Sequence, residues 1–474
     1  MLLIDLTKYI KFRKIYNFRK KKISFNYIFS NSKDITKGSL YALNNKRKLN
    51  SEYLQRAIKN GASAIISKKY IKNISIPQFI TDDLTYTIKK ITNKLFPNKP
   101  INSLAVTGTN GKTSVIWFVS QICINNNIGV KTYGTLGYFI NGIKKKHSHL
   151  TTPAYEVLHQ NAFSKKKNNY NFLFEASSHA LSQDRIINFP VNIAAITNIT
   201  HDHLDYHKTF KKYKNEKIKL FTHYLCQGGV AILNENIKGL QSLKKILKKN
   251  NKIITYGKNK SDVNIVFKKN KYEIKIFNKK NTLTLQDLSK IELENISCAI
   301  ACATALKINR YQIIKSIKKL KKPPGRLEKL NHKYKVYIDY AHTPDALKKI
   351  LENKTINEKK PNLVFGCGGN RDSDKREKMG FIANKFANKV YVTNDNPRNE
   401  NPKNIRKQII NKCSKGIEIP DRRMAIRKAI QELKKNEILI IAGKGHEKKQ
   451  IIKNKIIYLD DKKISEDELK KKYE

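Results

Sequence analysis

Short apolar runs alternate with helical stretches along most of this chain. Such runs are typical of buried strands, and their alternation with helices predicts parallel sheets. The predicted strands cover residues 38–43, 62–67, an apolar run ending at Val106, 172–176, 193–197, 229–233, 336–339, 362–365, 390–393 and 438–442. Residues 262–286 predict a small antiparallel insert instead. The predicted fold class is therefore α/β.

Two segments rich in residues that resist regular structure divide the chain into three predicted domains. Residues 96–100 read FPNKP and residues 321–326 read KKPPGR. A length of 474 residues suits about three domains. We expect a small N-terminal α/β domain (1–98), a central phosphate-loop domain with a doubly wound, mostly parallel sheet (99–327), and a C-terminal Rossmann-like α/β domain (328–474).

The loop after the strand that ends at Val106 has the composition of a phosphate-binding loop. It reads Thr107-Gly108-Thr109-Asn110-Gly111-Lys112-Thr113-Ser114, and a helix is expected from Val115 onward. The glycines let successive N–H groups turn toward phosphate oxygens at a helix N-terminus. Lys112 can reach the β- and γ-phosphates, and the Thr113 hydroxyl can bind Mg²⁺. Val106 stands where the common form of this motif has its first glycine. We predict that residues 108–114 bind ATP.

The net charge of +58 is the most unusual property of the composition. Lysine supplies 82 of the 96 basic residues and arginine only 14, and the lysines are spread through every segment. A nucleic-acid binder typically concentrates its charge on one face and favours arginine for bidentate contacts. The spread indicates a composition bias of the whole sequence, so we expect no specific nucleic-acid partner, only weak binding of polyanions at low salt.

The six cysteines are dispersed and include no C-x-x-C pair. Cys298 and Cys302 lie one helical turn apart in an alanine-rich segment, which predicts helix-packing residues. Reduced thiols are typical of a cytoplasmic protein. Residues 1–22 contain no signal-peptide core, and no later run of about 18 apolar residues could span a bilayer. We expect a cytoplasmic protein without membrane insertion.

Five polar blocks follow predicted strands in a fixed order, at the edge where open α/β sheets bind their ligands. They read TGTNGKT (107–113), EASSH (175–179), NITHDHLD (198–205), DYAHTP (339–344) and GKGHE (443–447). Together they resemble the Mur ligase family of ATP-dependent amide-bond-forming enzymes, over nearly the whole chain. The resemblance implies a ligase of peptidoglycan precursor synthesis that uses ATP and Mg²⁺ and forms an acyl phosphate.

Within that family, the block Asp395-Asn396-Pro397-Arg398 is the most discriminating. It resembles the amino-acid-selecting motif of members that add meso-2,6-diaminopimelate to UDP-N-acetylmuramoyl-L-alanyl-D-glutamate. Diaminopimelate carries a second amino-acid head, whose carboxylate suits the planar guanidinium of Arg398. Arg371 matches a second arginine used on the same substrate. A sibling ligase for L-lysine is the nearest alternative, but lysine would present only an ammonium to both arginines.

The resemblance also implies the metal site and the catalytic residues, which are Lys112, His203 and Lys217. Thr113 of the phosphate loop and Glu175, the carboxylate at the end of a predicted strand, are expected metal ligands. His203 matches a metal-site position by resemblance, although a histidine in a polar loop is more often a hydrogen-bond partner than a ligand. Lys217 matches a lysine that most of these ligases carry as a carbamate, an added carboxylate that serves the metal site. Only a neutral amine reacts with CO₂, so burial or neighbouring cations must lower the pKa of Lys217. Without the resemblance, the surrounding lysines would indicate a solvated face.

The remaining matched positions divide among the substrates. Hydroxyls, an amide and an arginine suit the diphosphate and carboxylate groups of the muramoyl peptide. The residues matched to that substrate are Ser32, Thr151, Thr152, Ser177, Gln183 and Arg185. The residues matched to ATP, beyond the phosphate loop, are Asn295, Arg326, Asp339 and His342. Gly443 and Glu447 match the far end of the diaminopimelate pocket, where Glu447 pairs with the substrate ammonium.

The N-terminal domain departs most from the family pattern. Asn31-Ser32-Lys33 replaces the usual Asp-Ser-Arg, and residues 44–50 lack the glycine- and histidine-containing loop expected near the uridine. A folylpolyglutamate synthase shares the phosphate loop and the two-domain core, but the additional N-terminal domain and residues 395–398 argue against it. A nucleic-acid-stimulated ATPase would explain the charge but not residues 340–342 and 443–447. We expect a monomeric ligase.

Overall fold

The computed structural model describes residues 1–18, 22–43, 51–148, 150–285, 288–330, 333–353 and 359–472. The chain forms two compact units. Unit 1 comprises Met1–Leu104 and Ile128–Asn192, and unit 2 comprises Ala105–Asn127 and Ile193–Glu474. The domain boundaries at residues 98 and 327 remain predictions, and the departure noted at residues 44–50 lies outside the described residues.

The first part of unit 1 is a five-stranded sheet in the order β1-β5-β4-β3-β2. All neighbouring strands are parallel except β1, which pairs antiparallel with β5. The elements are α1 (Leu3–Tyr9), β1 (Lys14–Tyr16), β2 (Tyr27–Phe29), β3 (Ser39–Leu43), α2 (Ser51–Lys59), β4 (Ala62–Ser67), β5 (Gln78–Ile80) and α3 (Leu84–Leu95). Apolar residues of β2, β3, β4 and α2 form one buried core. The predicted strands 38–43 and 62–67 are confirmed as β3 and β4.

The second part of unit 1 carries the predicted muramoyl-peptide residues other than Ser32. Its strands run in the order β10-β7-β8-β9, parallel between β10 and β7 and antiparallel beyond. The elements are β7 (Val130–Gly134), β8 (Gly137–Ile140), β9 (Ile143–Lys146), α5 (Tyr155–Ala162), β10 (Asn171–Glu175) and α6 (Ser178–Ser182). Strand β10 confirms the predicted strand 172–176, and Glu175 ends it.

The first part of unit 2 holds the phosphate loop. Its strands run in the order β16-β15-β14-β13-β12-β11-β6. They are β6 (Ser103–Thr107), β11 (Val191–Ile196), β12 (Leu225–Asn234), β13 (Lys252–Tyr256), β14 (Val263–Lys268), β15 (Lys271–Ile276) and β16 (Lys279–Leu283), and β6 and β11 begin in unit 1. The helices are α4 (Lys112–Asn125), α7 (Leu204–His207), α8 (Phe210–Lys219), the π-helix η1 (Leu220–Tyr224), α9 (Gln241–Leu247), α10 (Lys290–Ala305) and α11 (Arg310–Ile317). The predicted antiparallel insert is confirmed, because β14, β15 and β16 pair antiparallel.

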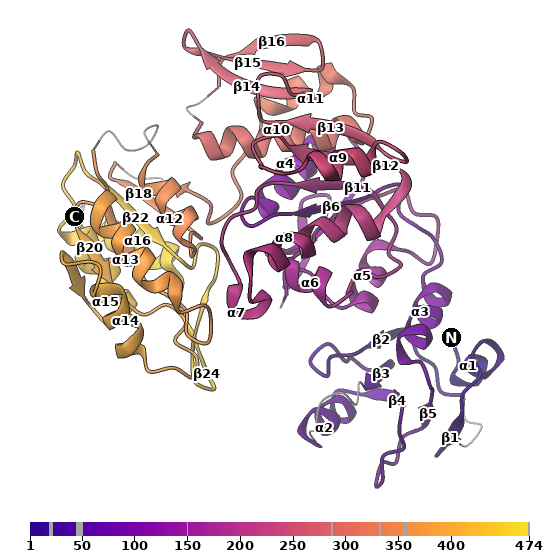
Figure 1. Cartoon of the computed structure of the whole chain (residues 1–474). Coiled ribbons are helices and arrows are strands. Elements are labelled where there is room, and N and C mark those ends of the chain that lie inside the picture. The colour runs from indigo at the N-terminus through magenta and orange to yellow at the C-terminus, as the bar shows by residue number, and fades with distance from the viewer. Residues whose placement is uncertain are drawn as a thin grey trace. The chain divides into compact units, whose positions relative to one another are not determined.

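Helices α4 and α10 pack side by side (Figure 1). Helix α10 begins with a capping box, in which Ser289 and Glu292 satisfy each other's backbone N–H groups. Cys298 and Cys302 are fully buried on it, which confirms that they are helix-packing residues. Helix α4 begins at Lys112, three residues before the predicted start, because the left-handed Gly111 (φ 90°) ends the loop there.

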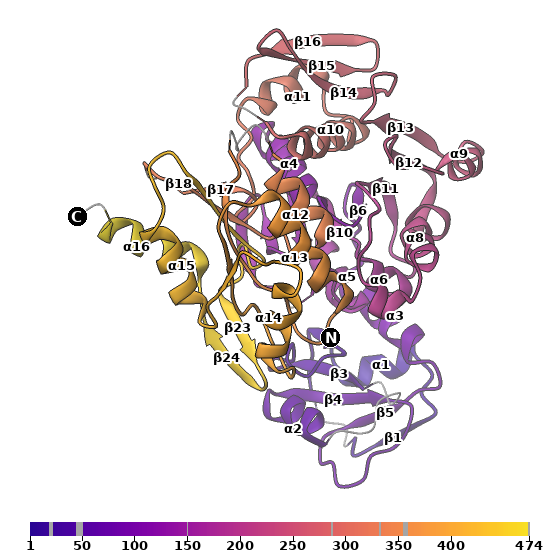
Figure 2. The same ribbon diagram turned by 60° about the vertical axis from the view of Figure 1, so that its left-hand side comes forward.

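The second part of unit 2 is a six-stranded sheet in the order β17-β18-β22-β19-β20-β21, parallel except for β17. The strands are β17 (Glu328–Lys329), β18 (Lys335–Asp339), β19 (Asn362–Phe365), β20 (Val390–Val392), β21 (Gly416–Glu418) and β22 (Ile438–Ala442), with a hairpin of β23 (Lys449–Ile452) and β24 (Lys455–Tyr458). The helices are α12 (Pro344–Leu351), α13 (Asp374–Phe386), α14 (Pro402–Ile410), α15 (Arg422–Gln431) and α16 (Asp461–Lys471). Two cores form on the two faces of this sheet, one under α12, α13 and α14 and one under α15 and α16 (Figure 2).

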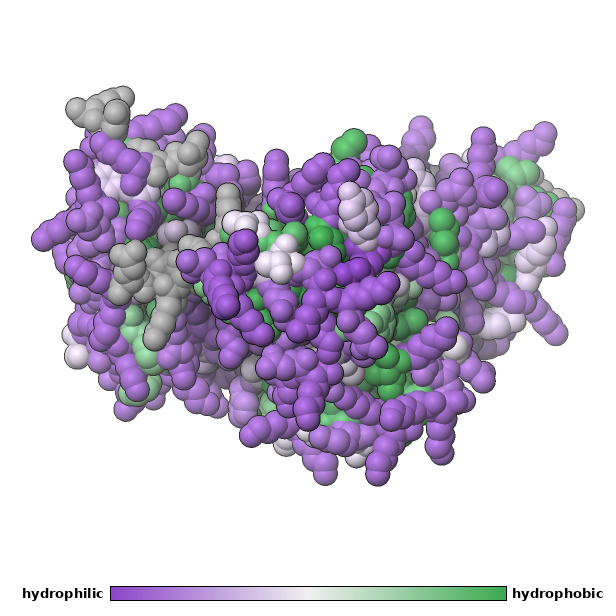
Figure 3. Space-filling model, turned by 90° about the horizontal axis from the view of Figure 1, so that it is seen from above, coloured by the Kyte–Doolittle hydropathy of each residue, from purple (hydrophilic) through white to green (hydrophobic). Residues whose placement is uncertain are grey.

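The α/β class with mostly parallel sheets is confirmed in both units. The face shown in Figure 3 is covered mainly by hydrophilic side chains, with small apolar patches between them. Within the described ranges, no helix is both long and apolar enough to cross a membrane.

Candidate active site

The phosphate loop is folded so tightly that two of its positions have no room for a side chain. Gly108 and Gly111 have φ values of 142° and 90°. A Cβ atom on Gly108 would lie 1.8 Å from Thr197 Oγ1, and one on Gly111 would lie 2.4 Å from Asn295 Oδ1. Lys112 Nζ donates to the carbonyls of Gly108 (2.8 Å) and Thr109 (2.9 Å). The loop therefore has the left-handed glycines and the curled lysine that suit phosphate binding.

Lys217 lies beside this loop, although it comes from α8. Its side chain is 1% exposed, and its Nζ donates to the Gly108 carbonyl at 2.8 Å. Burial, followed by the positive charge of Lys112, lowers the pKa of Lys217 well below its ordinary value, against an opposing effect of Asp202. A neutral amine is the form that can react with CO₂.

Asp202 is a buried carboxylate that the sequence analysis did not assign. Its Oδ2 lies 3.3 Å from His203 Nε2. Burial alone would raise the pKa of Asp202, but electrostatic interactions with the neighbouring His203, His342 and Lys375 outweigh burial and lower it. The only local signal was an acidic residue between two histidines in the block at 198–205. His203 itself has a left-handed backbone (φ 53°) that precedes α7.

Six of the predicted ATP residues lie around one cavity of unit 2. Asn110, Gly111, Ser114, Asn295, Arg326 and Asp339 line it. Apolar side chains, including Phe118 and Ile350, complete the wall. A wall of this kind, with a few amides among apolar groups, suits a purine base.

Backbone hydrogen bonds hold Asp339 and His342 in place. Asp339 accepts from the N–H groups of Leu327 (2.7 Å) and Ala341 (2.6 Å), and burial raises its pKa although Arg326 acts in the opposite direction. His342 Nδ1 lies 2.8 Å from the Tyr340 carbonyl. Burial lowers the pKa of His342 to about 4, and Lys375 acts in the same direction. His342 is therefore neutral at pH 7.

The block at 395–398 combines cationic and anionic groups. Arg398 has a left-handed backbone (φ 53°), and its Nη1 donates to the carbonyls of Gly369 (2.9 Å) and Asn396 (3.3 Å). Burial, then the charge of Arg371, lowers the pKa of Arg398. Asn396 donates to Glu447 Oε2 at 3.2 Å. Two arginines that lower each other's pKa, in a group of loops that also holds a carboxylate, would suit a ligand with a carboxylate and an ammonium.

Beside this block, Lys444 is fully buried with its Nζ 3.3 Å from Asn396 Oδ1, and Pro397 and Gly443 lie in the same group of loops. A Cβ atom on Gly443 would lie 2.9 Å from Asp395 Oδ2, so the two predicted segments touch.

Within unit 1, most of the predicted muramoyl-peptide residues are connected. Thr152 Oγ1 donates to the Glu175 carbonyl (2.6 Å) and contacts Ser177 Oγ (3.2 Å), and Arg185 Nη1 donates to the Thr152 carbonyl (2.9 Å). Gln183 accepts from Arg185 Nε at 3.0 Å. Thr151 is joined indirectly, because Thr135 contacts both Thr151 Oγ1 (3.2 Å) and the Glu175 carboxylate.

Ser32 is the one member of this set that lies in the first part of unit 1, in the turn after β2. It is 4% exposed, and its carbonyl accepts from Asn60 Nδ2 at 3.2 Å.

Two segments of the chain match the domains of one family. The Mur ligase middle domain matches residues 106–303, and the Mur ligase glutamate ligase domain matches residues 325–445. A UDP-N-acetylmuramoyl-L-alanyl-D-glutamate–2,6-diaminopimelate ligase of Rickettsia bellii (strain RML369-C) is 37% identical over 451 residues, which cover 92% of this chain and 94% of the relative. The chain belongs to the Mur ligase family.

Other comparisons agree with this assignment. A relative of the same name from Anaplasma marginale (strain St. Maries) is 35% identical and covers 86% of this chain and 89% of its own. A solved structure of a ligase of that name is 26% identical, with a TM-score of 0.61, and covers 100% of this chain and 99% of the other. The MurF ligase of Thermotoga maritima in complex with ADP, at 18% identity and a TM-score of 0.66, covers 95% of this chain and 99% of its own and shares the fold.

The predicted magnesium ligands of this Mur ligase include oxygen donors from a hydroxyl and a modified lysine. Among the residues that the structure describes, no three His, Cys, Asp or Glu side chains come together to hold a metal ion. The predicted ligands do not need such a cluster, because they include the Thr113 hydroxyl and a carbamate on Lys217. The buried amine of Lys217 fits that modification, and hard oxygen donors suit Mg²⁺. Glu175 lies in unit 1.

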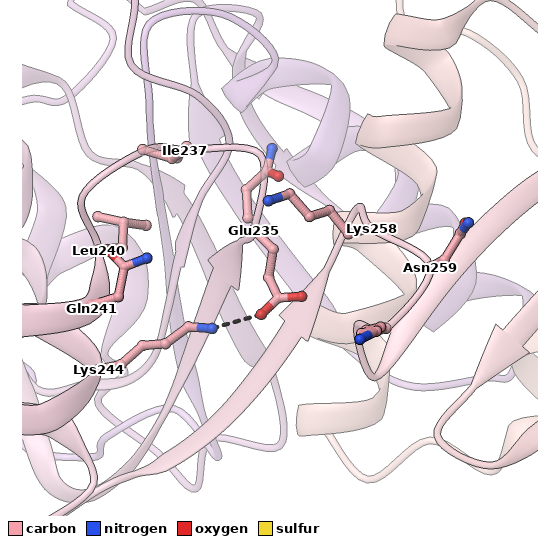
Figure 4. Close-up of a pocket in the computed structure, with 9 residues that line it drawn as sticks. Glu235, Ile237, Leu240, Gln241, Lys244, Lys258 and Asn259 are labelled. Atoms are coloured by element: carbon pink, nitrogen blue, oxygen red, sulfur yellow. Dashed lines mark hydrogen bonds and ion pairs between the residues drawn. The ribbon is translucent and has the colours of Figure 1, made fainter.

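A larger cavity of about 670 Å³ lies where β12 and β13 end. Figure 4 shows Glu235 and Lys244 facing each other in it, 2.6 Å apart. Glu235 also accepts a hydrogen bond from Ser261 Oγ at 2.6 Å. The ion pair with Lys244 therefore balances the charge of Glu235 within the cavity wall. Among the residues described there, none belongs to the predicted site.

Proposed function

We propose that this Mur ligase joins meso-2,6-diaminopimelate to the D-glutamyl carboxylate of UDP-N-acetylmuramoyl-L-alanyl-D-glutamate and converts ATP to ADP and phosphate. The observation that carries the proposal is that Arg398 and Arg371 both approach Gly368, where a Cβ atom would lie 2.9 Å from Arg398 Nη1 and 3.9 Å from Arg371 Cγ, while Asn396 of the same block donates to Glu447. These residues belong to the same unit as the phosphate loop. The second amino-acid head of diaminopimelate supplies both the carboxylate that neutralises the arginines and the ammonium that pairs with Glu447.

The reaction begins when the D-glutamyl carboxylate attacks the γ-phosphorus of ATP, which gives an acyl phosphate and ADP. The amine of diaminopimelate then displaces phosphate through a tetrahedral intermediate. The loop N–H groups and Lys112 orient the phosphates and balance their charge, and no protein nucleophile is needed. Asn295, Asp339 and His342 hold the nucleoside, and Arg326 approaches it from the segment that precedes β17.

The proposed magnesium ligands are Thr113, Glu175, His203 and the carbamate of Lys217. Bound Mg²⁺ supplies charge neutralisation for the phosphoryl group. The hydrogen bond from Lys217 to the Gly108 carbonyl holds the Lys217 side chain against the phosphate loop. A carboxylate added to Lys217 would therefore face the phosphates.

The muramoyl peptide is proposed to bind unit 1 through Ser32, Thr151, Thr152, Ser177, Gln183 and Arg185. The connected hydroxyl and guanidinium groups around Thr152 support this assignment, because they suit diphosphate and carboxylate oxygens. ATP and UDP-linked precursors belong to the cytoplasm, so we place the reaction there, with the protein acting as a monomer of three domains (1–98, 99–327 and 328–474).

The test is phosphate release by the purified protein with ATP, Mg²⁺ and UDP-N-acetylmuramoyl-L-alanyl-D-glutamate, with meso-diaminopimelate or L-lysine added in parallel. We expect release with diaminopimelate only. Arg398→Ala should lower kcat/KM for diaminopimelate by about 10- to 150-fold, the loss expected for a charge-assisted hydrogen bond.

The matched control is Arg427→Ala on α15, because the Arg427 side chain is 52% exposed and outside the site. Equal release with L-lysine would refute the amino-acid assignment while keeping the ligase. No release with either amino acid would refute the proposed reaction.

A further inference from the structure

Tyr340 lies between the proposed nucleotide and amino-acid subsites of unit 2. It follows directly after β18 and lines the same cavity as six of the predicted ATP residues. The guanidinium carbon of Arg326 lies 4.3 Å from the centre of its ring, and its hydroxyl donates to Glu447 Oε1 at 3.3 Å. One side chain thus contacts a residue assigned to ATP and a residue assigned to the amino acid.

Both partners of Tyr340 continue toward ligand-binding groups. Arg326 Nη2 lies 3.4 Å from Thr113 Oγ1 on the phosphate loop. Glu447 accepts from Asn396 Nδ2 at 3.2 Å. A continuous series of contacts therefore runs from the phosphate loop through Arg326, Tyr340 and Glu447 to the amino-acid-selecting block.

Close backbone packing fixes where Tyr340 can lie. A Cβ atom on Gly445 would lie 2.9 Å from Tyr340 Cβ, and one on Gly325 would lie 2.3 Å from the His446 nitrogen. The segments that carry Arg326, Tyr340 and Glu447 therefore touch one another at glycines. A ring held in this way does not need to be ordered when the ligands bind.

We propose that Tyr340 is a positioning residue for the two subsites: its ring orients Arg326 toward the phosphate loop, and its hydroxyl orients Glu447 toward the ammonium of the amino acid. The proposal rests on the function proposed above. The ring and the hydroxyl of Tyr340 can be tested separately. A phenylalanine at this position keeps the ring contact with Arg326 and loses only the hydroxyl contact with Glu447.

Two substitutions test the two halves. Tyr340→Phe should raise the KM for diaminopimelate about tenfold, as for the loss of one hydrogen bond to a charged group, and leave the Kd of a non-hydrolysable ATP analogue unchanged. Tyr340→Leu should raise the KM similarly and also raise the Kd of the analogue about threefold or more, because the cation–π contact is lost. The measurements are steady-state phosphate release and isothermal titration calorimetry.

Tyr311→Phe on α11 is the matched control, because Tyr311 is 73% exposed and remote from both subsites in sequence. Circular dichroism at the assay temperature checks that each variant is folded. The role of the hydroxyl would be overturned if the wild type released phosphate and Tyr340→Phe had the same KM for diaminopimelate as the wild type.

An unchanged analogue Kd in folded Tyr340→Leu would overturn the role of the ring. That titration needs no amino acid. If the wild type released no phosphate, the proposed function would fail, and the titration would still decide the role of the ring. If Tyr340→Leu did not fold, Tyr340→Met would replace it in the same titration.

Discussion

Two substitutions of Glu156 are expected to change stability in opposite directions. Glu156 lies on α5, its side chain is 3% exposed, and its Oε1 accepts from Ser30 N (2.8 Å) and Ser30 Oγ (2.5 Å). Burial is the main cause that raises the pKa of Glu156, and the hydrogen bonds from Ser30 oppose it only in part. Folding therefore favours the neutral form of this carboxyl group.

The sign of the pH dependence follows from this direction. A carboxyl group whose pKa is raised in the folded state makes its full contribution to the stability of the fold below its unfolded pKa, which is about 4.3. This contribution is lost as the pH rises through the folded pKa. Glu156→Gln keeps an acceptor oxygen for Ser30 and carries no charge. We expect the variant to be more stable than the wild type at pH 8, with the advantage shrinking toward pH 4.

Glu156→Ala should instead destabilise the protein, because it leaves the half-buried N–H and hydroxyl groups of Ser30 without their acceptor. The loss is about 1–3 kcal/mol, and each kcal/mol lowers the Tm by about 2–4 °C in a domain of 150–250 residues. Ser30 lies two residues before Ser32, so we also expect a higher KM for the UDP-linked substrate in the alanine variant than in the glutamine variant.

Scanning calorimetry from pH 4 to pH 8 measures the stability of the glutamine and alanine variants, and steady-state phosphate release measures the KM for the UDP-linked substrate. Glu52→Gln serves as the control, since Glu52 is 65% exposed and pairs with Arg56 on the surface. A glutamine variant less stable than the wild type at pH 8, or one whose advantage grew at lower pH, would refute the reasoning.

Three further substitutions test the site and its support. Gly111→Ala should weaken nucleotide binding at least about tenfold by calorimetry, because its Cβ would meet Asn295 at a φ of 90°; an unchanged Kd would mean that the loop can relax. Lys217→Arg should lower phosphate release by roughly a hundredfold and abolish a carbamate signal after labelling with ¹³C-bicarbonate; a wild type without that signal would contradict the carbamate. Arg422→Met should lower the free energy of unfolding in urea by about 3–5 kcal/mol, because it leaves the fully buried carboxylate of Asp461 without its ion-pair partner. Adding Asp461→Leu should recover most of this loss. Equal losses in the single and double variants would show that the pair is not coupled.

The parts of the fold that depend on local pattern could be predicted from the sequence. Apolar runs such as 438–442 became β22, and the polar blocks after the strands lie where parallel strands end. The start of α4 was placed too late because Lys112, Thr113 and Ser114 are polar, and polarity was taken to indicate a loop. Their N–H groups form the first turn of the helix, which is the part that faces a phosphate.

Long-range contacts could not be predicted from pattern. Glu156 and Ser30 are 126 residues apart, and nothing in the sequence around Glu156 indicates that this glutamate will be buried. Tyr340 and Glu447 are 107 residues apart and belong to different blocks. Each block was recognised by its own residues, whereas the contacts between blocks follow from the order of strands β18 and β22 in the sheet.

The charge of the protein and the chemistry of its site are separate properties. Most of the lysines lie on a hydrophilic surface such as that in Figure 3, where salt screens them and weak binding of polyanions is the main consequence. The cations around the proposed site are different, because Lys217 and Lys444 are at most 1% exposed and each has an oxygen partner. Burying a cation is unfavourable unless its position is fixed by such partners. Burial with partners, and not the net charge of +58, therefore distinguishes Lys217 and Lys444 from the surface lysines.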